Sequence, residues 1–345
     1  MFLVTNSTQV PFYFILMGIP GFEVFHTWIS IPFCCLYTIS IVGNSIILAV
    51  IRAEPSLHEP MNLFLSMLAL TDLGLTLTTW PAVMGILWFN ASEISFEACF
   101  IQFFFLHGFS FMESLVLLAR SFDHYVAIYH PLHYFCILTR RAICRIDLAI
   151  ICCCLLAVLP ALFLLKRLPF CGSPHLSHSY CLHQDMIHLV CADTTTNNWH
   201  EFVLVFLIMV LDPLLILLSY ALILRSVLRI APQVESPRAL NNCLSHILTV
   251  FILCVHLIGV SMTHRFAKHS LPVVHVSMAN VCVLAPPVMN PIIYSLKTNI
   301  SVEGFFTSLL VNSCNRVLRS DLLILFLKKI IWETWKIMLQ VSSHV

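Results

Sequence analysis

The chain has 345 residues, of which 59% are apolar and 10% are charged, whereas an ordinary soluble domain has about 25% charged residues. The formal net charge of +1 gives no field that would attract nucleic acid or another strongly charged partner. This composition excludes a disordered chain, a nucleic-acid-binding protein and a typical soluble enzyme. Long apolar runs that recur along the chain favour a single membrane-embedded bundle.

Seven stretches are apolar over enough residues to cross a bilayer, since a membrane helix needs about 20 of them. They cover residues 28–51, 62–89, 99–128, 143–165, 202–228, 240–263 and 272–296. Residues 1–26 have no basic residue before their apolar stretch, so we expect the first span to act as an uncleaved signal anchor. The sequence predicts an all-α membrane protein with an N-terminal segment (1–27), a seven-transmembrane domain (28–296) and a tail (297–345).

Basic residues set the orientation of these spans. Thirteen of the 18 lysines and arginines lie in the loops on one side or in the tail, and four lie on the other side. The side richer in basic residues is the cytosolic one, so we expect an extracellular N-terminus and a cytoplasmic C-terminus. The glycosylation sequons at Asn6 and Asn90 then lie outside. In the tail, Trp332 and Trp335 beside two lysines indicate an interfacial helix that contacts membrane lipid.

Four of the 15 cysteines lie at or near the outer ends of the spans, namely Cys99, Cys171, Cys181 and Cys191. An even number of cysteines in an oxidising compartment predicts two disulfides. Three pairings are open from the residues alone.

A series of short motifs runs along the spans. They are Gly43-Asn44, LHEPM at 57–61, LALTD at 68–72, Met112-Glu113-Ser114, FDHYVAI at 122–128, SYCLHQD at 179–185, Ser245-His246, His264-Arg265-Phe266 and PVMNPIIY at 287–294. Together they closely resemble the class I (fish-like) olfactory receptors, a branch of the rhodopsin-like G-protein-coupled receptors, over roughly residues 10–298.

The resemblance implies a plasma-membrane receptor rather than an enzyme. Such a receptor binds a small-molecule odorant and signals through the stimulatory olfactory heterotrimeric G protein to adenylyl cyclase. It also implies the disulfides Cys99–Cys181 and Cys171–Cys191.

Five residues are expected around one outer pocket. Arg265 lies about 25 residues past the cytosolic start of span six, roughly 37 Å along a helix, and Ser261 lies one turn deeper. His107 lies about 12 Å inside the outer end of span three, where a disulfide-bonded loop would hold His183 and Gln184. A guanidinium fits a carboxylate bidentately, and class I receptors are associated with carboxylic acids and other hydrophilic odorants. We therefore expect a small acid or similarly polar odorant; the alternative is that Arg265 meets only lipid headgroups.

Four polar residues are expected to share a layer inside the bundle. Counted from the cytosolic ends, Asn290, Asn44, Asp72 and Glu113 lie roughly 10, 12, 16 and 22 Å along their spans. Intramembrane carboxylates are costly and usually functional. This set suits a sodium ion or one shared proton, and a water-filled network is the alternative. No zinc-ligand spacing is present, so no other metal or cofactor is expected.

The cytosolic end of span three departs from the family pattern. Rhodopsin-like receptors have Asp-Arg-Tyr there, whereas this chain has Asp123-His124-Tyr125. An imidazole is mostly neutral at pH 7 and differs from arginine in reach and donor geometry. Coupling then either persists through Tyr125, Tyr220, Tyr294 and the basic loops or is weakened.

Arg120 is a second departure, since the family usually has an apolar residue there. It lies three residues before Asp123, so we expect the two side chains to form an ion pair that offsets part of the cost of burying an arginine. A receptor-like protein with weakened or lost coupling is therefore the alternative to a signalling receptor. The sequence has no internal repeat typical of a transporter and no G-x-S-x-G or H-E-x-x-H motif typical of an enzyme.

Overall fold

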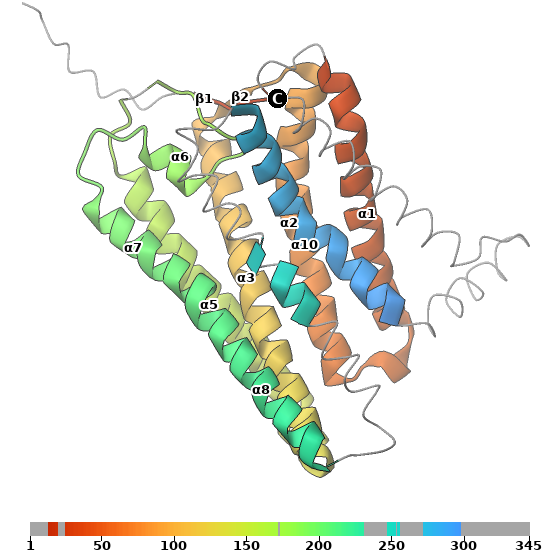
Figure 1. The fold of residues 1–345 in the computed structure, drawn as a ribbon. Helices are drawn as coiled ribbons and strands as arrows, with labels where there is room; N and C mark the ends of the chain where they lie inside the picture. The colour runs from red at the N-terminus through yellow and green to blue at the C-terminus, as the bar shows by residue number, and fades with distance from the viewer. Residues whose placement is uncertain are drawn as a thin grey trace, which may run out of the picture.

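The structure, a computed structural model, describes residues 13–19, 25–171, 173–230, 247–252, 254–255 and 272–297 (Figure 1). Its long helices stand side by side as a bundle, formed by α1 (His26–Ala53), α2 (Pro60–Phe89), α3 (Phe96–Tyr129), α5 (Arg140–Lys166) and α10 (Pro272–Lys297). Another rod runs end to end through α7 (Thr195–Phe206), the turn Leu207–Leu211 and α8 (Asp212–Ile230). Shorter helical segments are Pro55–Leu57, Pro131–His133, α4 (Tyr134–Ile137) and α6 (His183–Ile187).

These rods confirm the predicted helical fold. Every predicted span except the sixth lies within one described rod, and residues 247–252 and 254–255 of the sixth are helical. Within the described chain, α1, α2, α3 and α5 are each long and apolar enough to cross a membrane. Helix α3 is the central element, because it packs against α2, α5 and α8, while α1 packs against α2 and α10. The predicted tail helix and Asn6 lie outside the described residues.

Local signals in the sequence explain where the helices begin and end. Ser95 and Thr139 cap the first turns of α3 and α5, each accepting a hydrogen bond from the backbone N–H three residues on. Pro60 begins α2, at a position where a helix needs no N–H donor. The same helix ends at Asn90, which has the left-handed φ of 50° that asparagine tolerates.

The rod that carries the fifth span has a wide turn near its middle. Residues 207–211 form a single π-helical turn just before Pro213, whose missing N–H interrupts the ladder of hydrogen bonds. Here Asp212 is buried and accepts a hydrogen bond from Ser114 at 2.5 Å, which connects α8 to α3. A buried carboxylate in the middle of a membrane helix thus has a polar partner on the neighbouring helix.

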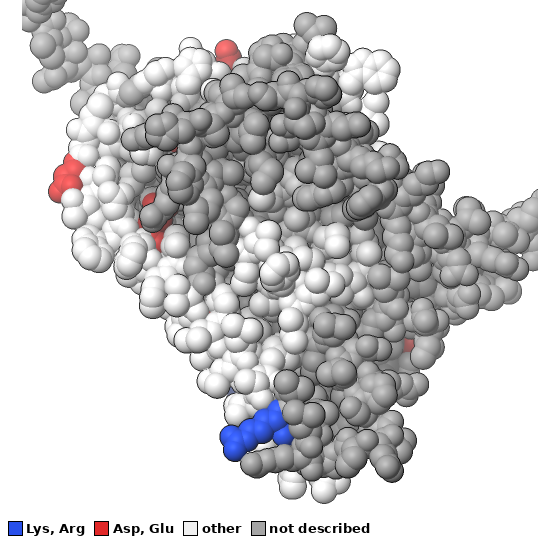
Figure 2. All heavy atoms as spheres, viewed as in Figure 1, with Lys and Arg blue, Asp and Glu red and all other residues white. Residues whose placement is uncertain are grey.

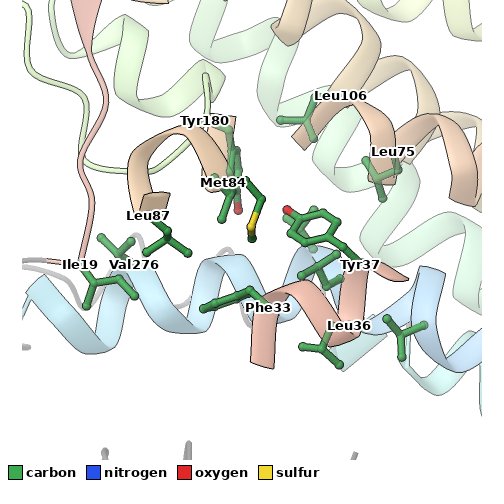
Figure 3. Packing of buried hydrophobic residues seen from close by; sticks show 14 of the residues in the cluster. Ile19, Phe33, Leu36, Tyr37, Leu75, Met84, Leu87, Leu106, Tyr180 and Val276 are labelled. Atoms are coloured by element: carbon green, nitrogen blue, oxygen red, sulfur yellow. The ribbon is translucent and has the colours of Figure 1, made fainter. Parts of the chain in front are cut away.

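The main apolar cluster lies between α1, α2, α10 and the outer loop (Figure 3). Phe33 and Tyr37 of α1 pack here near Met84 of α2 and Tyr180 of the loop, each at most 3% exposed. The Tyr37 hydroxyl donates to Thr79 at 3.1 Å, so its polar end is satisfied inside the cluster. Since lipid is as apolar as leucine, the close packing of these side chains and their hydrogen bonds hold the helices together.

The outer surface of the bundle is apolar, as a lipid-facing surface requires. On α5, Leu148 and Leu156 are 61% and 74% exposed, and Leu217 on α8 is 61% exposed. Among the described residues visible in Figure 2, few are charged, and the basic ones lie at one tip of the molecule. Arginines at the start of α5 and near the end of α8 lie on the side predicted to be cytosolic.

The described part of the N-terminal segment is folded onto the outer end of the bundle. Strand β1 (Tyr13–Ile15) pairs antiparallel with β2 (Glu93–Ser95), and the side chain of Phe14 is fully buried. The carbonyl of Met17 accepts a hydrogen bond from Ser179 of the outer loop at 2.9 Å. The sequence did not predict this two-stranded sheet, because each strand has only three residues and α1 and α2 separate the two strands in the chain.

Candidate functional site: an outer cavity above a polar core

The loop between α5 and α7 is fixed over the outer end of α3. The structure joins Cys99 to Cys181 and Cys171 to Cys191, the pairing that the resemblance implies. The backbone N–H of Cys181 also donates to Gln102 at 3.0 Å. A disulfide and a buried hydrogen bond therefore hold the following residues of the loop in a fixed place above the bundle.

Further contacts bind this loop to the rest of the outer end. His178 and Asp185 form a buried pair at 2.7 Å, and the Tyr180 hydroxyl donates to the carbonyl of Ala279 on α10 at 3.1 Å. Burial raises the pKa of Tyr180 well above its ordinary value, and the neighbouring Tyr37 adds to this effect, so the phenol stays protonated and can donate. The loop is thus a structured lid.

A cavity of about 180 Å³ lies beneath this lid, between α3, α5 and α7. Its wall is formed by Phe103, Leu106, His107, Ser110, Phe111, Val158, Ala161, Leu182, His183, Gln184, His200, Glu201, Leu204, Val205, Ile208 and Val283. Most of these side chains are apolar, and the polar ones come from α3, from the lid and from α7. Such a wall suits a small ligand with an apolar body and one polar end.

The polar end of the cavity contains a histidine–carboxylate pair. Nδ1 of His183 lies 2.9 Å from Oε2 of Glu201. Glu201 lies just before the predicted fifth span; burial alone would raise its pKa, but the hydrogen bond from His183 contributes most to lowering that pKa below its ordinary value. The carboxyl group is therefore ionised and accepts the Nδ1–H of His183.

His107 provides a second imidazole on the wall of the cavity. Its ring lies 4.5 Å from the ring of Phe103, and its Nε2 atom is buried without a hydrogen-bond partner among the described residues. A buried ring nitrogen of this kind can bind a polar atom of a ligand.

The structure brings together three of the five residues predicted to bind ligand. His107, His183 and Gln184 line one cavity, whereas Ser261 and Arg265 lie outside the described residues. The sequence reasoning missed Glu201 and His200, which also line the cavity. Their position just before the fifth span was the available signal, because that position places them at the outer end of a helix next to the loop.

The predicted polar layer is formed across α2, α3 and α10. Nδ2 of Asn290 donates to Asp72 at 3.0 Å and approaches Glu113 at 3.4 Å. Asn44 lies on α1 and donates to the carbonyl of Pro287 at 2.9 Å, which connects α1 to α10. One side-chain oxygen each of Asp72, Asn44 and Asn290 is buried without a hydrogen-bond partner in the described part of the chain. These oxygens are the kind of ligand that a hard cation takes.

Arg120 does not pair with Asp123 as expected. It is 1% exposed, and its guanidinium carbon lies 4.4 Å from the ring centroid of Tyr294 on α10. The hydroxyl of Tyr294 accepts a hydrogen bond from Thr249 at 3.3 Å. The predicted ion pair is wrong because the arginine side chain runs into the bundle toward α10, where an aromatic face partly satisfies its charge.

Asp123 instead connects α3 to the following loop. It accepts a hydrogen bond from the Tyr134 hydroxyl at 2.8 Å. Burial, together with the charge of Asp123, raises the pKa of Tyr134, which therefore stays protonated. Among the other residues of the predicted switch, His124 is 4% exposed and Tyr125 stacks on Tyr129 at 5.3 Å. Tyr220 and Tyr294 belong to one buried cluster.

The described residues contain no group of three or more His, Cys, Asp or Glu side chains placed to hold a metal ion. The candidate site consists of the cavity under the loop, the polar layer and the buried residues at the end of the bundle that is predicted to be cytosolic.

A comparison with solved structures identifies the fold. Squid rhodopsin matches with a TM-score of 0.68 over 90% of this chain and 95% of its own, at 16% sequence identity. The chain therefore has the seven-helix fold of the rhodopsin-like receptors.

The family follows from closer relatives. The family model for the olfactory receptors matches residues 33–312. Olfactory receptor 51Q1 from Homo sapiens is 69% identical over 85% of this chain and 93% of its own length, and olfactory receptor 51G2 from Homo sapiens is 53% identical over 86% and 94%. The chain belongs to the olfactory receptor family, in agreement with a class I assignment. It is thus a G-protein-coupled odorant receptor of the plasma membrane, and members of this family are not enzymes.

Proposed function

We propose that this receptor detects a small carboxylic acid or a similarly polar odorant in the outer cavity. The observation that supports the proposal is a mostly apolar cavity of about 180 Å³ whose wall includes His107, His183 and Gln184. An alkyl chain gains about 0.8 kcal/mol for each buried CH₂ group on such a wall. The polar residues bind the other end of the molecule and select its headgroup.

An acid in this cavity needs a cation, since the described wall already carries the carboxylate of Glu201. Arg265 is the residue proposed for this role, with Ser261 one helical turn deeper completing its hydrogen bonds. A guanidinium would bind the ligand carboxylate through two parallel N–H donors. This role rests on the predicted position of Arg265 at the outer end of the sixth span.

Replacing Arg265 with alanine is expected to raise the EC50 of acids by roughly 10- to 100-fold, the loss expected for one charge-assisted contact. Cyclic AMP is measured in cells against hexanoic and octanoic acids, with surface staining to normalise expression. Arg167→Ala is the control, because Arg167 is an exposed basic residue of the same outer face that does not line the cavity. An unchanged dose response of Arg265→Ala to the acids would reject the proposed role.

The proposed pathway runs through a stimulatory G protein to adenylyl cyclase, with the N-terminus outside and the C-terminus in the cytosol. The asymmetry of basic residues supports this orientation, since it places the arginines that begin α5 next to a cytosolic partner. The alternative is a receptor with weakened or lost coupling. The replacement of the usual arginine by His124, at the position nearest to that partner, is the observation that favours it.

We propose a sodium ion as the occupant of the polar layer. Asp72, Asn290 and Asn44 fit such an ion, because each has a buried side-chain oxygen without a partner among the described residues. Bound there, the ion would offset one of the two negative charges that Asp72 and Glu113 carry when both are ionised. The alternatives are a proton shared by Asp72 and Glu113 or a network of water molecules.

Sodium is therefore expected to raise the melting temperature of the purified receptor by a few degrees relative to choline at equal ionic strength, because a ligand that binds only the folded state stabilises it. Asp72→Asn should abolish the difference, and Asp147→Asn, which changes a half-buried carboxylate of α5 remote from the layer, should keep it. Equal melting temperatures of the wild type in the two salts would exclude the ion.

A further inference from the structure

The pair formed by His183 and Glu201 determines whether Nε2 of His183 is a hydrogen-bond donor or acceptor toward a ligand. Glu201 is ionised and accepts the Nδ1–H of His183 at 2.9 Å. A carboxylate can only accept, so a neutral His183 is fixed as the tautomer with hydrogen on Nδ1. Its Nε2 atom is then a lone-pair acceptor on a ring that lines the cavity. A ligand carboxylate cannot hydrogen-bond that lone pair, whereas a ligand O–H can.

We propose that the receptor binds a carboxylic acid together with its proton, and that Glu201 is the positioning residue responsible. This inference rests on the proposed function. The acid O–H bond breaks, its proton forms a bond to Nε2 of His183, and the resulting carboxylate accepts the Nε2–H hydrogen bond. The electron pair of the broken bond stays on the ligand oxygen, and the imidazolium lies between two carboxylates. The total charge is the same before and after the transfer.

The surroundings of His183 support this arrangement. Among the described residues, the titratable or charged groups that face it are His107 from α3 and both His200 and Glu201 from α7, and the Gln184 amide lies beside it. Of these, only Glu201 is an anion, so it alone stabilises an imidazolium at position 183. The Phe103 ring lies 6.0 Å from that of His183, which places an apolar surface next to the pair.

This mode of binding gives a pH dependence that binding of a free carboxylate to Arg265 lacks. When the acid is ionised in solution and His183 is neutral in the unliganded receptor, binding takes up one proton. The EC50 of the acid should therefore rise about tenfold between about pH 7 and about pH 8 in the wild type. A neutral glutamine at position 201 can donate to Nδ1 and place the hydrogen on Nε2, so that a carboxylate binds without taking up a proton.

The test measures cyclic AMP against hexanoic acid at these two external pH values. We expect a tenfold change in EC50 for the wild type and for Glu201→Asp, which keeps the charge, and little change for Glu201→Gln. Glu97→Gln is the matched control, because Glu97 is an outer carboxylate 3.0 Å from Lys166 and outside the cavity; it should keep the wild-type dependence.

Three results would overturn the inference in distinguishable ways. A pH-independent EC50 in the wild type would mean that the acid binds as its anion, and the proposed function would stand without the proton. An equal pH dependence in the wild type and Glu201→Gln would remove Glu201 from the mechanism. No response of the wild type to hexanoic or octanoic acid at either pH, at normal surface expression, would overturn the proposed function and this inference together.

Discussion

Replacing His124 with arginine is expected to raise ligand-stimulated cyclic AMP roughly three- to tenfold at equal surface expression. His124 is buried at the cytosolic end of α3, beside the carboxylate that Tyr134 binds. Arginine has a permanent charge, a longer side chain and a planar guanidinium with several N–H donors, none of which an imidazole provides. If the active state is sparsely populated, a gain of about 1 kcal/mol in that state changes its population severalfold.

The control for this gain is His133→Arg, which places the same new charge at an exposed position in the adjacent loop. It should leave the response close to that of the wild type, because it does not restore the triplet. Unchanged or lower cyclic AMP for His124→Arg would show that Tyr125, Tyr220 and Tyr294 already support coupling without an arginine in the triplet.

Much of the fold could be predicted because bilayer solvation imposes long apolar runs. The described ends of helices α1, α2, α3, α5 and α10 lie within three residues of the ends of the predicted spans. The polar layer could be predicted for a related reason. A rise of 1.5 Å per residue placed Asp72, Glu113 and Asn290 within about 12 Å of one another in depth, so these polar residues were expected to share one layer. The structure places a carboxylate oxygen of Asp72 and one of Glu113 within hydrogen-bond distance of the Asn290 amide nitrogen.

Contacts that depend on side-chain direction or on loop register could not be predicted in this way. Arg120 and Asp123 are neighbours on α3, yet the arginine lies against Tyr294 because its side chain turns toward α10. His183 and Glu201 are 18 residues apart across an irregular loop, so no helical or strand periodicity predicts their contact. The disulfide pairing came from the resemblance, because four cysteines alone allow three pairings.

Filling the outer cavity is the second change expected to have a large effect. Ala161 of α5 is 7% exposed and lines the cavity. Phenylalanine at this position would occupy much of the cavity volume of about 180 Å³. Because the packed wall leaves little room to adjust, we expect Ala161→Phe to raise the EC50 of every ligand that uses the cavity by about 100-fold or more.

A matched change on the same helix separates occlusion from a general effect of added bulk. Leu156 is 74% exposed on the lipid-facing side of α5, so Leu156→Phe adds an aromatic ring without touching the cavity. Both variants should reach the cell surface, since the first fills a cavity and the second faces lipid.

The dose response of cyclic AMP to hexanoic acid, compared between Ala161→Phe and Leu156→Phe at equal surface expression, tests the central claim most directly. We predict that Ala161→Phe loses the response while Leu156→Phe keeps the wild-type EC50. A wild-type EC50 for Ala161→Phe would mean that the odorant binds elsewhere, and the site described above would be wrong.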